Sequence, residues 1–173
     1  GHMGYVLAGL AAGTNAGIQG TIIYLTIYLV MNLGAFGCIF MMKRENIFYE
    51  NINDLSGLSK NHPMLALSFL IILFSLAGIP PLAGFFAKFY VFMAVIEVKM
   101  YALAIIGLVT TVISAFYYLR IIKVIYFDKP TKPFEESYDW GLKISLILSS
   151  ILILTYFIYP SILVDTISSI LIY

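Results

Sequence analysis

The most constraining feature of this sequence is that its charges fall in short clusters separated by long apolar runs. One run without any charged residue extends from Ile18 to Met42, and Lys43-Arg44-Glu45 follows it directly. A helix needs about 20 apolar residues to cross the hydrocarbon core of a bilayer. With 61% hydrophobic and 11% charged residues among 173, the chain has more apolar surface than a soluble domain can bury. The bilayer is therefore the expected solvent, which excludes a soluble enzyme, a disordered chain and a DNA-binding domain.

The spacing of the charge clusters predicts an all-α, polytopic transmembrane helix bundle. We expect about five spans plus one partial N-terminal helix, together forming a single transmembrane region over 1–173. The expected apolar helices are bounded by charged, Pro-rich or Gly-rich segments, and they cover residues 5–12, 18–42, 63–78, 82–97, 100–126 and 141–159, with a shorter apolar end at 161–173.

A broken helix is expected near residues 78–84. The segment from Pro63 to Ile96 would be roughly 50 Å long as one helix, which is too long for one span. Pro80 and Pro81 stand between glycines, including Gly84, and they cannot lie inside a straight helix. We therefore predict two antiparallel helices joined by an abrupt turn or a broken stretch. The backbone N–H and C=O groups of an irregular segment in a membrane need hydrogen bonds from protein or water.

Lys88 is the only charge inside this long apolar segment. An ammonium near the bilayer centre costs at least about 2.5–3.5 kcal/mol, and such a residue normally faces the bundle interior and marks an ion or proton path. We therefore expect Lys88 to transfer protons. The alternative is a lysine paired with a carboxylate for structure alone, but no carboxylate is visible at this depth in the sequence.

Other polar residues inside the apolar segments are candidates for a supporting role. His2 is a natural proton relay if it is buried. The alternatives are that Gly1-His2-Met3 is a remnant of an expression vector, or that His2 is a terminal histidine in water. Tyr28 and Asn32 are four residues apart and share one helix face. Together with Tyr118 they can line a hydrated path, or they can simply join helices by hydrogen bonds.

The sequence contains no phosphate-binding glycine loop, no CxxC pair and no nucleophile–base constellation. Two histidines and one cysteine are too few for a dedicated metal site. We therefore expect no cofactor, no metal and no redox chemistry in this chain itself.

Several segments resemble one family, the antiporter-like membrane subunits of proton-pumping NADH:quinone oxidoreductase, respiratory complex I. The resemblance covers essentially the whole chain and is most specific over Ser75–Tyr90 (SLAGIPPLAGFFAKFY). Residues 1–5, 32–37, 54–58 and 117–120 are also similar to the family pattern, which favours a native origin for Gly1-His2-Met3. Within the family the chain is most similar to the C-terminal part of the subunit N branch, the bacterial counterpart of mitochondrial subunit 2.

The resemblance implies a proton-translocating role driven by quinone reduction elsewhere in the complex. Lys88 corresponds to the lysine of the broken helix in the second half-channel, and His2 corresponds to a polar residue of the central hydrophilic axis. NADH, FMN, iron–sulfur clusters and quinone are then used by other subunits. The implied partners are the other membrane subunits of complex I, adjacent antiporter-like subunits, lipid and the N-terminal portion of the same subunit, but no nucleic acid. The implied location is a bacterial plasma membrane or a mitochondrial inner membrane.

Two other functions stay open at this point. The same helices would suit a subunit of a related cation/proton antiporter or a membrane-bound hydrogenase. The chain could also be a structural membrane fragment without transport activity of its own.

Overall fold

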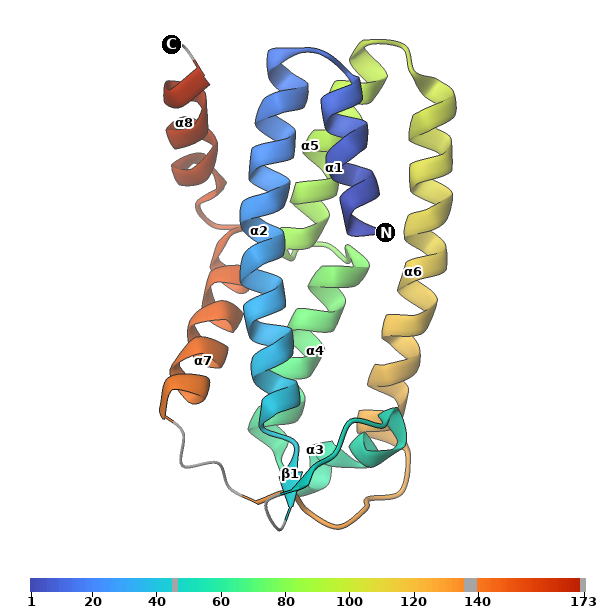
Figure 1. Cartoon of the computed structure of the whole chain (residues 1–173), viewed down its shortest axis with the longest axis vertical. Helices are drawn as coiled ribbons and strands as arrows, with labels where there is room; N and C mark the ends of the chain where they lie inside the picture. The colour runs from blue at the N-terminus through green and yellow to red at the C-terminus, as the bar shows by residue number, and fades with distance from the viewer. Residues whose placement is uncertain (45–46, 136–139, 172–173) are drawn as a thin grey trace.

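The protein, analysed as a computed structural model, is a bundle of helices that run along one long axis (Figure 1). The structure describes residues 1–44, 47–135 and 140–171, so Glu45 lies outside the described residues. The long elements are α1 (His2–Ala11), α2 (Asn15–Phe40), α4 (Pro63–Ala77), α5 (Ala83–Glu97), α6 (Tyr101–Phe127), α7 (Trp140–Thr155) and α8 (Pro160–Leu171). The short elements at the lower end are β1 (Lys43–Arg44), β2 (Ile47–Phe48), η1 (Ile52–Leu55) and α3 (Leu58–Asn61).

The all-α membrane bundle expected from the sequence is confirmed, apart from the two-residue strands β1 and β2, which pair antiparallel. Within the described residues, α2 and α6 are each long and apolar enough to cross a membrane, and α7 and α8 are long and apolar enough only when they are counted together. These two short helices meet at an angle of 89°. The predicted single helix over 141–159 is therefore shorter than expected, because α7 already ends at Thr155.

The expectation of two antiparallel helices over 63–97 is wrong. Figure 1 shows α5 continuing in the direction of α4, so that together they traverse the bundle once as a single interrupted helix. The expected total of about five spans is therefore too high, because the expected spans at 63–78 and 82–97 are the two halves of one traverse. Glycine and proline mark where a helix stops, but they do not set the direction in which the chain continues.

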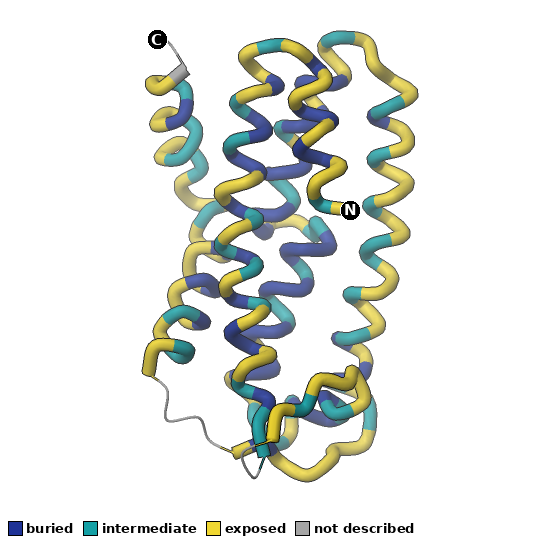
Figure 2. The backbone as a smooth tube through the Cα atoms, in the orientation of Figure 1, coloured by how far each residue is buried: buried dark blue, intermediate teal, exposed yellow. Residues whose placement is uncertain are grey.

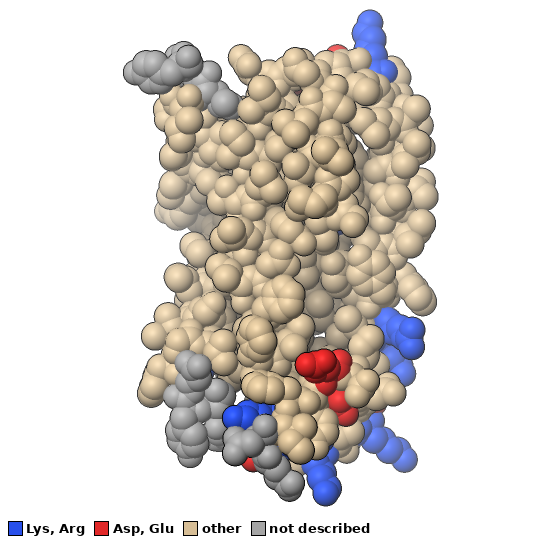
Figure 3. Space-filling view, viewed as in Figure 1, with Lys and Arg blue, Asp and Glu red and all other residues tan. Residues whose placement is uncertain are grey.

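The burial pattern is that of a protein dissolved in lipid. The dark blue buried positions in Figure 2 concentrate on α2, α4 and α5, while the outer helices are largely exposed. On α6 the side chains of Val112 and Phe116 are 72% and 71% exposed. Lys, Arg, Asp and Glu gather at the two ends of the face seen in Figure 3 and leave a wide apolar band between them. Such a contiguous apolar belt needs hydrocarbon or protein against it.

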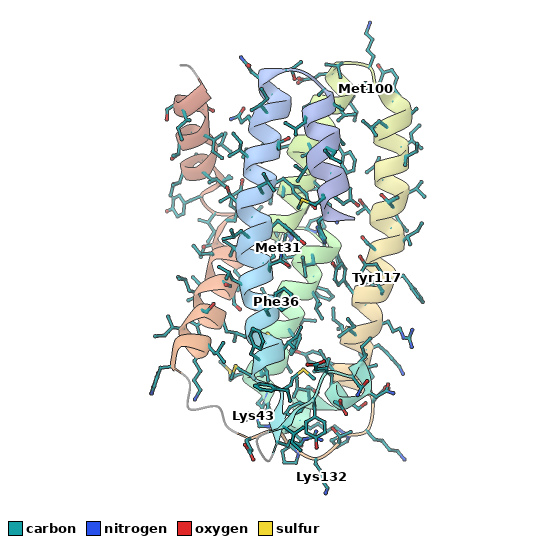
Figure 4. All side chains as sticks on the ribbon, viewed as in Figure 1. Met31, Phe36, Lys43, Met100, Tyr117 and Lys132 are labelled. Carbon is teal, nitrogen blue, oxygen red and sulfur yellow. The ribbon has the colours of Figure 1, made fainter. Side chains whose placement is uncertain are left out.

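The interruption between α4 and α5 lies near the middle of the long axis, at about the height of the N-terminus of α1 (Figure 1). Gly78 ends α4 with a φ of +87°, a left-handed conformation that glycine adopts without strain. The backbone N–H of Gly84 then donates to Ser75 Oγ at 2.9 Å, and the Ser75 hydroxyl donates to Met31 Sδ at 3.0 Å. Figure 4 places Met31 on α2 beside this interruption. The first turn of α5 is thereby fixed against the last turn of α4.

We predict that Gly84→Ala destabilises this junction, because a β-carbon at Gly84 would collide with the carbonyl oxygen of Ser75. Overpacking of this kind costs about 1–3 kcal/mol, which lowers the melting temperature by several degrees. The measurement is the thermal unfolding midpoint of the purified protein in detergent.

The matched control is Gly37→Ala in α2, a buried glycine whose added β-carbon would lie 4.0 Å from the nearest atom, Leu146 Cδ1. This variant should melt at or above the parent temperature, because alanine favours a helix over glycine by about 1 kcal/mol. Equal melting temperatures for the two variants would contradict the close packing at Gly84.

Candidate functional site

Lys88 lies on α5 and is 5% exposed, which makes it a buried cation in the middle of the bundle. Its ammonium donates to two backbone carbonyls, Leu76 O at 3.1 Å and Ala77 O at 3.2 Å. Both carbonyls belong to the last turn of α4. The last four carbonyls of a helix have no partner within the helix, and they carry the negative end of its dipole. Lys88, which lies on α5, therefore provides hydrogen-bond donors for the unpaired carbonyls at the end of α4.

This arrangement depends on the glycine that ends α4. A β-carbon at Gly78 would lie 3.1 Å from Lys88 Nζ and 3.2 Å from Lys88 Cδ. Any other residue there would press on the lysine side chain and would also have to adopt a left-handed backbone conformation. The interruption thus provides both the acceptors and the space that Lys88 occupies.

His2 is the centre of a second polar cluster, built from α1, α2 and α6. Its Nδ1 lies 2.7 Å from Tyr24 Oη, and its Nε2 lies 3.0 Å from Tyr118 Oη. The ring also stacks on Tyr28, with 4.6 Å between centroids. In a neutral imidazole one nitrogen donates and the other accepts, so one tyrosine accepts a hydrogen bond from the ring while the other donates to it. The cluster can therefore pass a proton from one side of the ring to the other by a change of tautomer.

Tyr5 connects the two clusters. Its ring centroid lies 5.2 Å from Lys88 Nζ, within the range of a cation–π contact. The same ring lies 6.3 Å from the ring of His2 in an edge-on arrangement. Lys88 and His2 are therefore parts of one continuous group of polar and aromatic side chains.

A cavity of about 420 Å³ opens beside His2, between α1, α5 and α6. Polar side chains contribute to its lining along with the apolar ones, among them Thr110 and Ser114 of α6 and Tyr117, which is labelled in Figure 4. This cavity is open at the surface of the bundle, because Ile106 and Ile113 in its lining are 61% and 62% exposed. The His2 ring can therefore be reached from this side.

The structure brings some of the predicted site residues together and separates others. Tyr28 and Tyr118 both contact His2, as described. Asn32 is not a hydrogen-bond partner of His2 in the part of the chain that the structure describes; it lines a groove between α2 and α7 together with Tyr28, with which it shares a helix face as expected, and Ser145 also lies there. Pro80 and Pro81 are exposed in the interruption itself, and the backbone N–H of Gly84 donates to Ser75 of α4.

Sequence analysis did not single out three residues that shape the site: Tyr5, Ser75 and Thr111, whose hydroxyl oxygen lies 2.7 Å from that of Tyr5. Tyr5 carried a usable signal, because it lies three residues after His2 and therefore on the same face of α1. Ser75 and Thr111 carried none, since their partners are distant in the sequence. Among the described residues no group of three His, Cys, Asp or Glu side chains is placed to hold a metal ion.

Comparison with known proteins assigns the chain to a family. Residues 1–114 match the family model described as "NADH:quinone oxidoreductase/Mrp antiporter, TM". The chain is 64% identical over 170 residues to NADH-quinone oxidoreductase subunit N of Pelagibacter ubique, covering 98% of this chain and 36% of that protein. It is 50% identical over 165 residues to subunit N of Rhodospirillum rubrum, covering 95% and 34%. The chain thus spans about a third of the length of these relatives.

Solved structures show the same fold. A chain of respiratory complex I from Thermus thermophilus superposes with a TM-score of 0.78 at 27% identity, over 93% of this chain and 36% of that chain. A chain of the Mrp complex from Dietzia sp. superposes with a TM-score of 0.82 at 21% identity, over 96% and 39%. The second likeness concerns the fold alone.

We predict that Tyr24→Phe and Tyr118→Phe each destabilise the protein, because each removes one hydrogen-bond partner of the His2 ring. A polar group left unpaired in the interior costs about 1–3 kcal/mol. The thermal unfolding midpoint in detergent should fall by several degrees. Tyr101→Phe is the control, since Tyr101 is 55% exposed at the start of α6. A control that melts as low as the two variants would show that His2 gains nothing from its tyrosines.

Proposed function

The chain belongs to the NADH:quinone oxidoreductase/Mrp antiporter family of membrane proteins, and from this premise we propose that it forms part of a proton-translocating subunit of NADH:quinone oxidoreductase. The proposal follows subunit N, the name carried by its relatives in Pelagibacter ubique and Rhodospirillum rubrum. Its location is then the bacterial plasma membrane, in keeping with the bacterial sources of these relatives.

One observation carries the proposal: a lysine is buried inside the helix bundle and is held by hydrogen bonds from its ammonium to two backbone carbonyls of an interrupted helix. A purely structural cation would be better matched by a carboxylate, whose full charge compensates the ammonium more strongly than carbonyl dipoles do. Acceptors that carry only partial charge leave both the protonated and the neutral lysine accessible. Buried ionisable groups of this kind in membranes mark ion and proton paths.

In the proposed mechanism Lys88 takes up a proton from the side of the His2 cluster and later releases it toward one face of the membrane. His2 acts as a relay, because it can accept at one ring nitrogen and donate at the other. Tyr24, Tyr28 and Tyr118 hold its ring in place. The interruption at Pro80 and Pro81 admits water to the lysine when the two half-helices move apart.

The energy for this transfer comes from quinone reduction in other subunits, which also hold NADH, FMN and the iron–sulfur clusters. The partners of the chain are then the adjacent antiporter-like and other membrane subunits, the surrounding lipid and the remaining portion of the same subunit. The exposed apolar side chains of α6 are available for such contacts.

A second candidate is a subunit of a cation/proton antiporter of the Mrp type, since the family model that matches residues 1–114 includes both groups. The identities of 64% and 50% to subunit N relatives favour the first candidate. Purification of the full protein from its native membrane discriminates between them, because only the first requires NADH-oxidising and quinone-reducing subunits to co-purify.

We predict that Lys88→Met and Lys88→Arg, each placed in the assembled complex, abolish most proton pumping. Methionine has similar length but no charge, and arginine keeps the charge but does not release its proton at physiological pH. Pumping should fall by roughly an order of magnitude or more, as when a proton-transfer group is removed. The measurement is the proton gradient formed by membrane vesicles per quinone reduced.

Lys129→Met is the control, because Lys129 is an exposed lysine in the loop after α6. It should pump like the parent. Normal pumping by Lys88→Arg would overturn the proposal, since a group that keeps its proton cannot pass it on. Normal pumping by both Lys88 variants, in a fully assembled complex, would instead support a structural membrane fragment.

A further inference from the structure

The ring of Tyr5 has a fixed orientation in the centre of the bundle. Tyr5 is 7% exposed and packs in the hydrophobic core between α1, α2, α5 and α6. Its ring contacts Phe92 edge-on, with 5.9 Å between centroids, and Tyr24 at 5.7 Å. These contacts leave the ring little freedom to rotate away from Lys88.

The hydroxyl of Tyr5 is engaged by a residue of α6. It lies 2.7 Å from Thr111 Oγ1 on α6. The Thr111 hydroxyl already donates to the carbonyl oxygen of Gly107 at 2.9 Å. Since a hydroxyl has one hydrogen, the Tyr5 hydroxyl donates to Thr111 whenever the Thr111 hydrogen is on Gly107 O, and it accepts from Thr111 otherwise. Tyr5 therefore offers Lys88 its ring and keeps its hydroxyl for α6.

The face of an aromatic ring carries the negative part of its quadrupole and attracts a cation. Lys88 Nζ lies 5.2 Å from the centroid of the Tyr5 ring and donates to the carbonyls of Leu76 and Ala77. The ammonium therefore has acceptors on α4 and an aromatic partner on α1. The charged lysine is thus favoured in one place, at the end of α4. The neutral amine gains much less from the ring.

We propose that Tyr5 is a positioning residue for Lys88: its ring, packed against Phe92 and Tyr24, holds the protonated ammonium at the end of α4 and next to the His2 cluster. This inference rests on the proposed function, because it assigns Tyr5 a role in proton transfer through Lys88. It adds a specific prediction, namely that the ring and its electrostatics matter while the hydroxyl is secondary.

The titratable groups around Lys88 come from several helices. His2 of α1 lies near enough to interact with it electrostatically, and Tyr24 and Tyr28 of α2 and Tyr118 of α6 surround His2. On α4 the groups that face the ammonium are backbone carbonyls. Changes at Tyr5 therefore act on Lys88 without removing any of these groups.

The test uses the assembled complex in membrane vesicles and compares Tyr5→Leu with Tyr5→Phe. Tyr5→Leu removes the ring, so proton pumping should fall several-fold and the alkaline limb of its pH profile should move about 0.5–1.5 pH units toward lower pH. Tyr5→Phe keeps the ring and should restore most of the rate and the parent profile. Thr111→Val, which removes only the hydroxyl group that the Tyr5 hydroxyl contacts, should resemble Tyr5→Phe. Tyr101→Leu makes the same chemical change at an exposed tyrosine and should leave the profile unchanged.

A second measurement guards against a simple packing defect. Incorporation of pentafluorophenylalanine at position 5 keeps the shape of phenylalanine but reverses the ring quadrupole, so the profile should move as in Tyr5→Leu. A fluorinated variant that behaves like Tyr5→Phe would overturn the proposal, as would a parental profile for Tyr5→Leu. Lys88→Arg is measured alongside: if it pumps normally, the proposed function itself fails. If it does not pump while Tyr5→Leu is normal, only the role of Tyr5 fails.

Discussion

A buried ammonium is tolerated in an apolar bundle only if other groups replace the water it has lost. In this protein the replacement is the end of a helix, since Lys88 donates to the carbonyls of Leu76 and Ala77. The rest of the central region follows from this requirement. The helix must stop near the middle of the bundle, Gly78 must stop it without a side chain, and Gly84 must let the next half-helix begin close enough for its lysine to reach back.

The sequence was sufficient to predict the elements whose limits depend on local chemistry. The apolar run at 18–42 became α2 (Asn15–Phe40), and Pro63 begins α4 at a position where its missing N–H costs nothing. The interruption was also predicted at the right place. Its direction was not, because the angle between α4 and α5 is decided by contacts such as that of Ser75 with Gly84 and Met31, which come from tertiary packing.

The candidate site was predictable only where the polarity of a residue differs from that of its neighbours in the sequence. Lys88 was evident as a charge within an apolar run, and its burial is as expected. Its partners were not evident, because every residue has a carbonyl and only the fold determines which ones are left unpaired. The contact between His2 and Tyr118 joins residues 116 positions apart, and no spacing rule reaches that far.

The use of backbone carbonyls by Lys88 has a consequence for mutagenesis. An alanine scan reveals a counter-ion by deleting its side chain, but no substitution deletes a carbonyl oxygen. The carbonyl acceptors of Lys88 would therefore stay hidden in any survey of side chains, and they would be equally invisible to a search for co-varying residue pairs. Its genetic signature would instead be an intolerance of change at the glycine that lets the helix end.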